Sequence, residues 1–210
     1  MRPVIFSRTL ANAVVGAICA SQTPGGAGNL LINGTLASGG VATMAAQQII
    51  GITSAANLSG ITFTITGTDD AGRTISEVLT GPNIATVQSV FNYRTVTRIA
   101  VSGAAAGALT VDTLQTGASL EVVVDRYISP TSISIGVEVT GVINYSIQWT
   151  LDDVFGGAPG PFSWFAGAAN LTNATTTQAG SIVSPVSAIR IVNNSGAGTA
   201  KLIVQQAGLV

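Results

Sequence analysis

Two pairs of adjacent carboxylates, Asp69-Asp70 and Asp152-Asp153, are the acidic clusters of this 210-residue chain. Two carboxylates across a cleft could hydrolyse a glycosidic bond, and several together with other oxygens could bind Ca²⁺. Adjacent residues on a strand point to opposite faces, however, and Asp residues in turns commonly accept hydrogen bonds from backbone N–H groups. The Asp-x-Asp-x-Asp-Gly spacing of a calcium loop is absent from the sequence. We therefore expect these four residues to cap turns, and we expect no catalytic or metal-binding residue.

The composition excludes other common chemistries. The chain has no His and a single cysteine, Cys19, which excludes Ser-His-Asp and Cys-His catalysis, His-ligated metals and an intrachain disulfide. The glycine-rich residues 156–160 lack the Lys-Ser/Thr ending of a phosphate-binding loop. Eight Lys and Arg against nine Asp and Glu give a net charge of −1, so no basic surface for nucleic acid is expected. We expect a protein that is not an enzyme and needs no cofactor.

Aromatic residues follow the glycine-rich run. Phe162, Trp164 and Phe165 come after it, and Trp149 lies on the strand predicted before it. Trp residues often anchor protein interfaces, and aromatic platforms also bind sugars. Trp149 and Phe165 could equally belong to a hydrophobic core. Phe162 and Trp164 are therefore candidate interface residues, with core packing and glycan binding as the alternatives.

The elements that must position these residues are strands. Ile61, Phe63 and Ile65 alternate with polar residues, turn residues follow at 68–72, and residues 73–80 return the chain, which predicts a hairpin. The same reasoning predicts further strands at 93–103, 119–128, 132–141, 142–153, 187–194 and 200–206. No sustained helical stripe follows residue 50. Short, turn-punctuated strands of this kind are typical of antiparallel sandwiches and barrels, so the expected fold class is all-β.

One pattern occurs twice. An alternating strand that ends in Asp-Asp precedes an Ile-containing strand, a Gly/Ala/Ser turn and a final strand, first from residue 61 and again from residue 144. The repetition predicts two tandem antiparallel β-sandwich domains, residues 29–117 and 118–210, preceded by an N-terminal extended arm, residues 1–28. The alternative is one large sandwich whose hairpins resemble each other.

The predicted arm is a candidate interface. An isolated segment cannot bury its own apolar side chains, so a neighbouring subunit is expected to hold it, and its deletion over residues 2–24 is expected to leave both domains folded. In the alternative, the arm packs on its own domain as an edge strand. Residues 1–22 resemble a signal peptide only superficially, and no stretch has the ~18–20 apolar residues of a membrane span. The candidate contact residues are Arg2, Val4, Ile5, Phe6 and Arg8.

The low content of charged residues favours a protein that functions as part of an assembly. Charged residues make up 8% of the chain, against roughly 25% in an average soluble protein. A protein with so few charges and almost no net charge has weak colloidal repulsion and tends to associate. The alternative is a secreted β-protein whose surface is wetted by Ser and Thr.

Several blocks of the sequence resemble a recurring structural protein of tailed bacteriophages. In the first half these are SGGVAT (38–43), SGITFTITGTDDAGRTISEVLTGPN (59–83) and VFNYRTVTRIAVSG (90–103). In the second half they are DRYISPTSISIGVEVTGVINYSIQWTLDD (125–153), WF (164–165), SPVSAIRI (184–191) and AGTAKLIVQ (197–205). Together they span about residues 38–205, and the motif Gly-Thr-Asp-x-x-Gly…Gly-Pro-Asn is their most specific part.

The resemblance implies a non-enzymatic component of the virion. The first expectation is a capsid decoration (cement) protein that binds the head shell and neighbouring subunits through its arm. The alternatives are a ring component of the neck or tail, and an adhesin that binds host glycan through Trp149, Phe162 and Trp164. The implied partners are the major capsid protein or neck and tail proteins, together with other copies of the chain. Neither nucleic acid nor membrane is expected as a partner.

Overall fold

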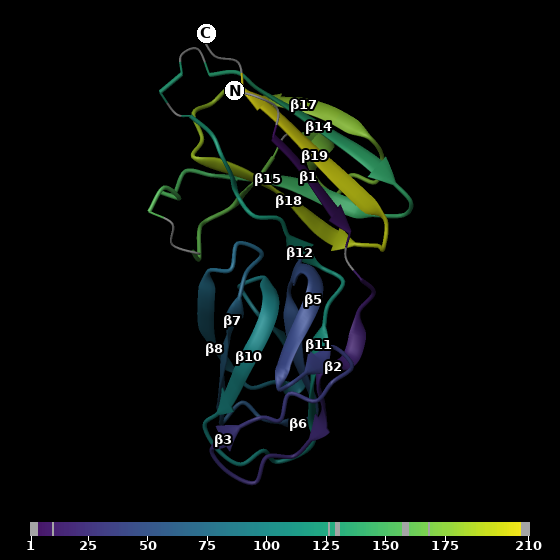
Figure 1. Cartoon of the computed structure of the whole chain (residues 1–210), viewed down its shortest axis with the longest axis vertical. Coiled ribbons are helices and arrows are strands. Elements are labelled where there is room, and N and C mark those ends of the chain that lie inside the picture. Colours follow the sequence, from purple (N-terminus) through teal and green to yellow (C-terminus); the bar gives the residue numbers. More distant parts are fainter. Residues whose placement is uncertain are drawn as a thin grey trace. The chain divides into compact units, whose positions relative to one another are not determined.

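The computed structural model describes residues 4–9, 11–125, 127–128, 131–156, 160–167 and 169–206. The protein is all-β, as predicted, and its strands pair antiparallel throughout the described part (Figure 1). A single-turn 3₁₀ helix, η1 (Ala169–Leu171), lies between two of the strands.

The chain divides into two compact units. One unit is continuous in sequence, Asn12–Leu114, and the other is split, because it combines Met1–Ala11 with Gln115–Val210. We call them the continuous unit and the split unit. The strands of the continuous unit are β2 (Val14–Gln22), β3 (Gly28–Asn29), β4 (Ala37–Ser38), β5 (Val41–Gln48), β6 (Ile50–Asn57), β7 (Thr62–Thr68), β8 (Thr74–Thr80), β9 (Asn83–Gln88), β10 (Tyr93–Val101) and β11 (Leu109–Thr113). The strands of the split unit are β1 (Val4–Thr9), β12 (Gly117–Ala118), β13 (Val122–Val123), β14 (Ile133–Thr140), β15 (Asn144–Thr150), β16 (Phe165–Ala166), β17 (Gln178–Ile182), β18 (Ala188–Ser195) and β19 (Thr199–Gln206).

The continuous unit is a sandwich of two sheets. One sheet has the order β4-β5-β10-β7-β8, with β3 added beside β10, and the other has the order β2-β11-β6-β9. Alternate residues point inward, so Phe63 and Ile65 of β7 are fully buried. They share one hydrophobic core with Ile52 of β6 and Val111 of β11, which come from the opposite sheet. Burial of apolar area between the sheets is the main stabilising contribution of such a fold.

The split unit is a second sandwich with its own core. Its sheets have the orders β1-β19-β14-β17 and β12-β18-β15-β16, with β13 also pairing with β18. Leu202 of β19 and Ile135 of β14 pack from one sheet against Tyr145 of β15 and Ile191 of β18 from the other. Val4 and Phe6 of β1 pack against the same core.

The two units share one strand order. Each has an edge strand, β2 or β1, that pairs with the last strand of its unit, followed in the sheet by β6 or β14 and then by β9 or β17. In the facing sheets, β10-β7-β8 corresponds to β18-β15-β16. This correspondence gives a structural basis for the internal sequence repeat, because the repeated segments are the strands β7, β10 and β11 in one unit and β15, β18 and β19 in the other.

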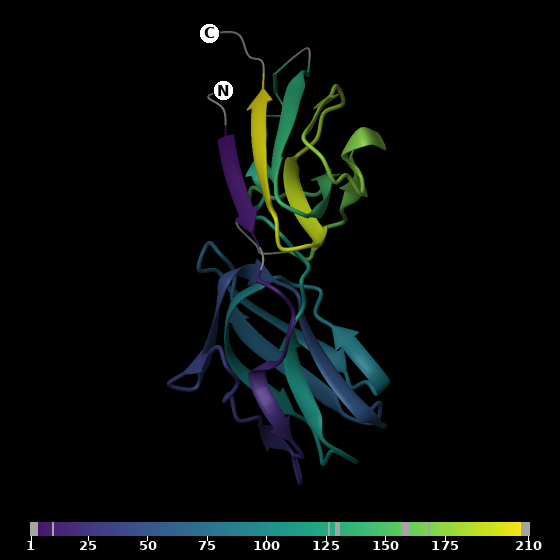
Figure 2. The ribbon, with the colours of Figure 1, turned by 90° about the vertical axis from the view of Figure 1, so that its right-hand side faces the viewer.

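The N-terminal segment differs from the expected arm. Residues 4–9 form β1, which pairs with β19 along its whole length, from Val4↔Val204 to Thr9↔Thr199 (Figure 2). Residues 14–22 form β2, which pairs with β11 and places Ile18 and Cys19 fully inside the core of the continuous unit. The expectation of one extended arm over residues 1–28 is therefore corrected, because the segment supplies an edge strand to each sandwich.

The strand predicted at residues 119–128 is also corrected. Among its described residues, only Val122–Val123 forms a strand, which pairs with β18. Asp125 is held instead by the side chain of Gln206, which accepts a hydrogen bond from the Asp125 N–H at 2.9 Å and donates one to the Asp125 carbonyl at 2.6 Å. The Gln206 side-chain amide therefore makes the hydrogen bonds with the Asp125 backbone that a neighbouring strand would otherwise make.

Candidate functional site

The first carboxylate pair closes the β7–β8 hairpin. Asp69 Oδ1 accepts hydrogen bonds from the backbone N–H groups of Ala71 and Arg73, each at 2.9 Å, and its Oδ2 pairs with Arg73 Nε at 2.6 Å. Asp70 Oδ1 accepts from the Gln47 N–H at 3.1 Å, while the Asp70 N–H donates to Gln47 Oε1 at 2.8 Å. Both carboxylates therefore accept hydrogen bonds from backbone N–H groups, as the sequence predicted.

The second pair behaves in the same way. Asp152 Oδ2 accepts a hydrogen bond from the Ser163 N–H, and Asp153 Oδ1 accepts one from the Phe155 N–H at 3.1 Å. Asp152 thereby ties the segment that carries Phe162 and Trp164, which we call the aromatic loop, to the end of β15. Over the described ranges, no three His, Cys, Asp or Glu side chains are grouped so that they could hold a metal ion.

We expect Asp69→Ala to lower the free energy of unfolding by about 2–4 kcal/mol, since charge-assisted hydrogen bonds contribute roughly 1.5–3 kcal/mol each and the freed N–H groups would lose their acceptor. Asp153→Ala is the matched control, because that side chain holds one backbone N–H in an exposed loop. Urea titrations followed by circular dichroism would compare the two variants. Equal, small effects would contradict the assignment.

The Gly-Thr-Asp-x-x-Gly motif is explained by the same hairpin. A Cβ at Gly67 would lie inside the van der Waals radius of the Thr95 carbonyl oxygen on the neighbouring β10. Gly72 has φ of +76°, which favours glycine. The residues that carry the bacteriophage resemblance in this block therefore build a turn and a close strand contact.

The aromatic residues form two separate contacts. Trp149 is half-buried against the core of the split unit and stacks on Phe165 with the ring centroids 4.8 Å apart. Trp164 meets the edge of Phe162 at 6.4 Å, and the Arg190 guanidinium lies 4.0 Å from the Trp164 ring centroid. Trp149 therefore packs against the core, whereas Phe162 and Trp164, which are equally half-buried, contact each other, and Trp164 lies beside Arg190.

Arg190 connects the aromatic loop to the sheet. Its Nε and Nη2 donate to Gln148 Oε1, its cross-strand neighbour on β15, at 2.9 and 2.7 Å. Burial lowers the pKa of Arg190 to about 10, with the Glu121 carboxylate opposing the shift and the positive charge of Arg8 adding to it. The guanidinium stays protonated at neutral pH, so its contact with the Trp164 ring is a cation–π interaction.

Sequence reasoning missed a polar network further along strands β15 and β18. Asn194 Nδ2 donates to Asn144 Oδ1 at 2.7 Å, Ser146 Oγ at 2.8 Å and Asn173 Oδ1 at 3.1 Å. Asn173 has φ of +52°, a left-handed conformation that Asn tolerates. Nothing local in the sequence indicates that the segments carrying Asn144, Asn173 and Asn194 meet.

Four of the five N-terminal candidate residues lie on β1. Val4 and Phe6 face the core, Arg8 is buried, and Ile5 is 55% exposed on the opposite face. Arg2 lies outside the described residues, as do residues 157–159 of the glycine-rich run. Val4 and Phe6 thus pack against the core of their own chain. The aromatic candidates Phe162 and Trp164 contact each other elsewhere in the split unit.

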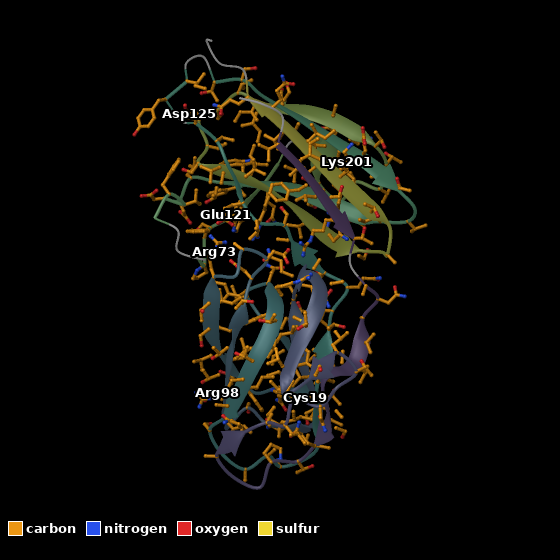
Figure 3. The ribbon with its side chains drawn as sticks, viewed as in Figure 1. Cys19, Arg73, Arg98, Glu121, Asp125 and Lys201 are labelled. Carbon is orange, nitrogen blue, oxygen red and sulfur yellow. The ribbon has the colours of Figure 1, made fainter. Side chains whose placement is uncertain are left out.

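Cys19 is an inert core residue. It is fully buried in the continuous unit (Figure 3), and burial, reinforced by the negative charge of Asp112, raises the pKa of its thiol from 9.0 to about 12. Because the thiolate is the reactive form, the folded protein should resist alkylation.

We expect Cys19 to be unlabelled by iodoacetamide at pH 8 in the native protein and fully labelled in urea. The raised pKa also favours folding below pH 9, and this contribution is lost as the pH rises from about 9 toward 12, since the unfolded thiol ionises first. Wild type should therefore lose more stability than Cys19→Ala between pH 9 and 11 in urea titrations. Parallel pH profiles for the two proteins would count against this linkage.

No helix among the described residues has the length and apolar character needed to cross a bilayer. No protein-family model matches the chain, and no curated protein matches it either.

Proposed function

We propose that the chain is a non-enzymatic structural protein of a bacteriophage virion, and specifically a capsid decoration protein that binds the head shell. The placement in a virion comes from the sequence blocks that resemble tailed-phage structural proteins. The role of a contact protein is supported by an exposed aliphatic strip on the continuous unit.

The aliphatic strip consists of Val14, Val15, Leu31 and Leu36. Val15 is 77% and Leu31 65% exposed. The two segments are joined, because the Leu36 N–H donates to the Ala17 carbonyl at 2.9 Å and the Leu31 N–H donates to Gln22 Oε1 at 3.0 Å. Leu36 therefore lies near the Val14–Val15 end of β2 and Leu31 near its Gln22 end, so the exposed side chains are spread along two neighbouring segments. Exposed aliphatic residues that gather in this way can mark a protein-binding surface. With few charges available on the chain, this strip is the best candidate for the contact with the shell.

The acidic residues support the non-enzymatic part of the proposal. The carboxylates of both Asp pairs accept hydrogen bonds from the backbone and thereby hold turns and loops. These are structural roles, and a decoration protein needs no others from them.

We expect the double substitution Val15→Asp with Leu31→Asp to weaken binding to isolated phage heads by at least about tenfold, since an interface residue of the binding centre typically contributes more than ~1 kcal/mol. Val142→Asp is the matched control, because Val142 is 86% exposed on the split unit. Co-sedimentation of labelled protein with heads would measure both. Unchanged binding of the double variant would remove the strip from the proposal.

The main alternative within the virion is a ring of the neck or tail. Copy number separates the two, because a shell takes hundreds of copies and a closed ring takes a small symmetric number. Electron microscopy of particles that carry a tagged chain, with quantitative gel analysis of purified virions, would decide between them. Absence of the chain from the virion would overturn both.

A glycan-binding adhesin is a second candidate, favoured by Trp164 beside Arg190 and Gln148. An aromatic ring flanked by amide and guanidinium donors is a common sugar-binding arrangement. Binding of the free chain on a glycan array, lost in Trp164→Ala, would support this candidate over decoration.

A further inference from the structure

The edge strand β1 belongs to a unit from which it is separated in sequence. It pairs with β19 at six consecutive positions and completes the sheet edge. Along the sequence, the whole continuous unit, Asn12–Leu114, separates β1 from the rest of the split unit. A few residues after Thr9 connect it to β2. The split unit thus contains one strand whose nearest neighbour in the sequence is the continuous unit.

The contacts of β1 are those of an integral strand. Its inner face adds Val4 and Phe6 to the core, and Arg8 is buried at the far end. Burial of an apolar side chain contributes to stability wherever the side chain comes from, so an identical strand from another molecule would satisfy the same contacts.

The continuous unit offers a direct comparison. Its corresponding edge strand, β2, pairs with β11 and is followed directly by the rest of its own unit. The other edge of β2 is also held, because Ala17 and Ile18 carbonyls accept hydrogen bonds from the N–H groups of Leu36 and Gly34. Strand β1 is the outermost strand of its sheet, where it pairs with β19, and a short connection joins it to the other unit rather than to its own.

We propose that β1 exchanges between copies of this chain, so that β1 of one molecule pairs with β19 of another in the same register. Closed and exchanged forms contain the same strand contacts and differ in the connection at residues 10–13 and in the cost of association. The closed form is favoured in dilute solution, because intramolecular pairing acts at an effective concentration of about millimolar. Exchange is favoured where copies are crowded.

This inference deepens the proposed function, on which it rests only for the place where crowding occurs. Copies seated side by side on a shell would reach such local concentrations. Exchanged strands would then link neighbouring decoration proteins, with a second copy of the chain as the partner of the N-terminal segment. Self-association itself can be measured without heads.

The test mixes two full-length chains that each carry one new surface cysteine. Ser7 and Lys201 are opposite each other across β1 and β19. Cα atoms of opposite residues on antiparallel strands lie about 4.5–5.5 Å apart, which suits a disulfide. A Ser7→Cys chain with a size tag is unfolded together with an untagged Lys201→Cys chain, refolded at micromolar and near-millimolar concentrations, and oxidised. Only an exchanged β1 brings the two cysteines of the differently sized chains together. Cys19 stays buried.

The matched control uses Glu138→Cys with the same Lys201→Cys chain. Residues 138 and 201 face each other across β14 and β19, which belong to one continuous stretch of the split unit. Their ion pair, at 2.9 Å, is exposed and contributes little to stability. This mixture reports random collisions between chains.

We expect the Ser7/Lys201 mixture to give at least about ten times more heterodimer than the control on non-reducing gels, with a yield that rises with protein concentration. A heterodimer yield equal to the control at the highest concentration would overturn the exchange. Binding to heads without exchange would support the decoration function and reject strand exchange. Exchange without binding to heads would support self-association and reject the decoration function.

Discussion

Deletion of residues 2–24 is expected to unfold the continuous unit and destabilise the split unit. The deletion removes β2, whose Ala17, Ile18 and Cys19 are fully buried, and β1, whose Val4 and Phe6 pack on the other core. At roughly 1.5–3 kcal/mol for each large buried apolar side chain, and with the β2–β11 hydrogen bonds lost as well, the cost approaches the ~5–15 kcal/mol stability of a typical domain. This outcome replaces the expectation that the N-terminal segment is dispensable for folding.

Deletion of residues 2–9 is the matched control, since it removes β1 and leaves β2 in place. Scanning calorimetry should then show an unchanged transition for the continuous unit and a lowered one for the split unit. The longer deletion should also abolish the first transition and expose Cys19 to iodoacetamide at pH 8. Two native transitions in the longer deletion would show that β2 is not needed by its sheet.

Strong local patterns made parts of the fold predictable. The β7–β8 hairpin follows from alternating Ile and Phe around a turn, and the turn-capping role of Asp69 follows from its position in that turn. Strand β2 carries no comparable pattern, because its residues are mostly small and Gly16 interrupts it with φ of +66°. Strand β5, rich in Ala and Gln, and strand β6, half of which is Gly, Ser and Ala, had no strand prediction for the same reason.

Long-range pairing could not be predicted from the sequence. Nothing local to residues 4–9 indicates a partner at residues 199–204, because strand register depends on tertiary packing across the whole chain. The Asn194 network is similar, since Asn144, Ser146 and Asn173 meet only after β15, β18 and the 172–177 segment have folded. The candidate site was therefore predictable where one turn builds it and hidden where several segments do.

The split unit without β1 is expected to be unstable. A fragment of residues 115–206 lacks β1, so Leu202 and Val204 of β19 lose the neighbours that face them across the sheet edge. Losing Val4 and Phe6, both half-buried, should cost about 2–5 kcal/mol, which lowers Tm by ~10–30 °C in a domain of this size. We expect the fragment to melt early or without cooperativity, so it would not fold as an independent domain of full stability.

A circular permutant supplies the decisive comparison. Because Val4 lies opposite Val204 in an antiparallel register, the start of β1 lies beside the end of β19. A loop of about two to five residues can therefore join Gln206 to Val4 as a hairpin. The permuted chain, residues 115–206 followed by the loop and residues 4–9, should recover a cooperative melt at high temperature. The same chain with Val4→Ser and Phe6→Ser should not, because its added strand can pair with β19 but buries no apolar side chain. If the fragment, the permuted chain and its double Ser variant all melted alike in circular dichroism, β1 would contribute nothing to the core. The split unit would then be complete without β1.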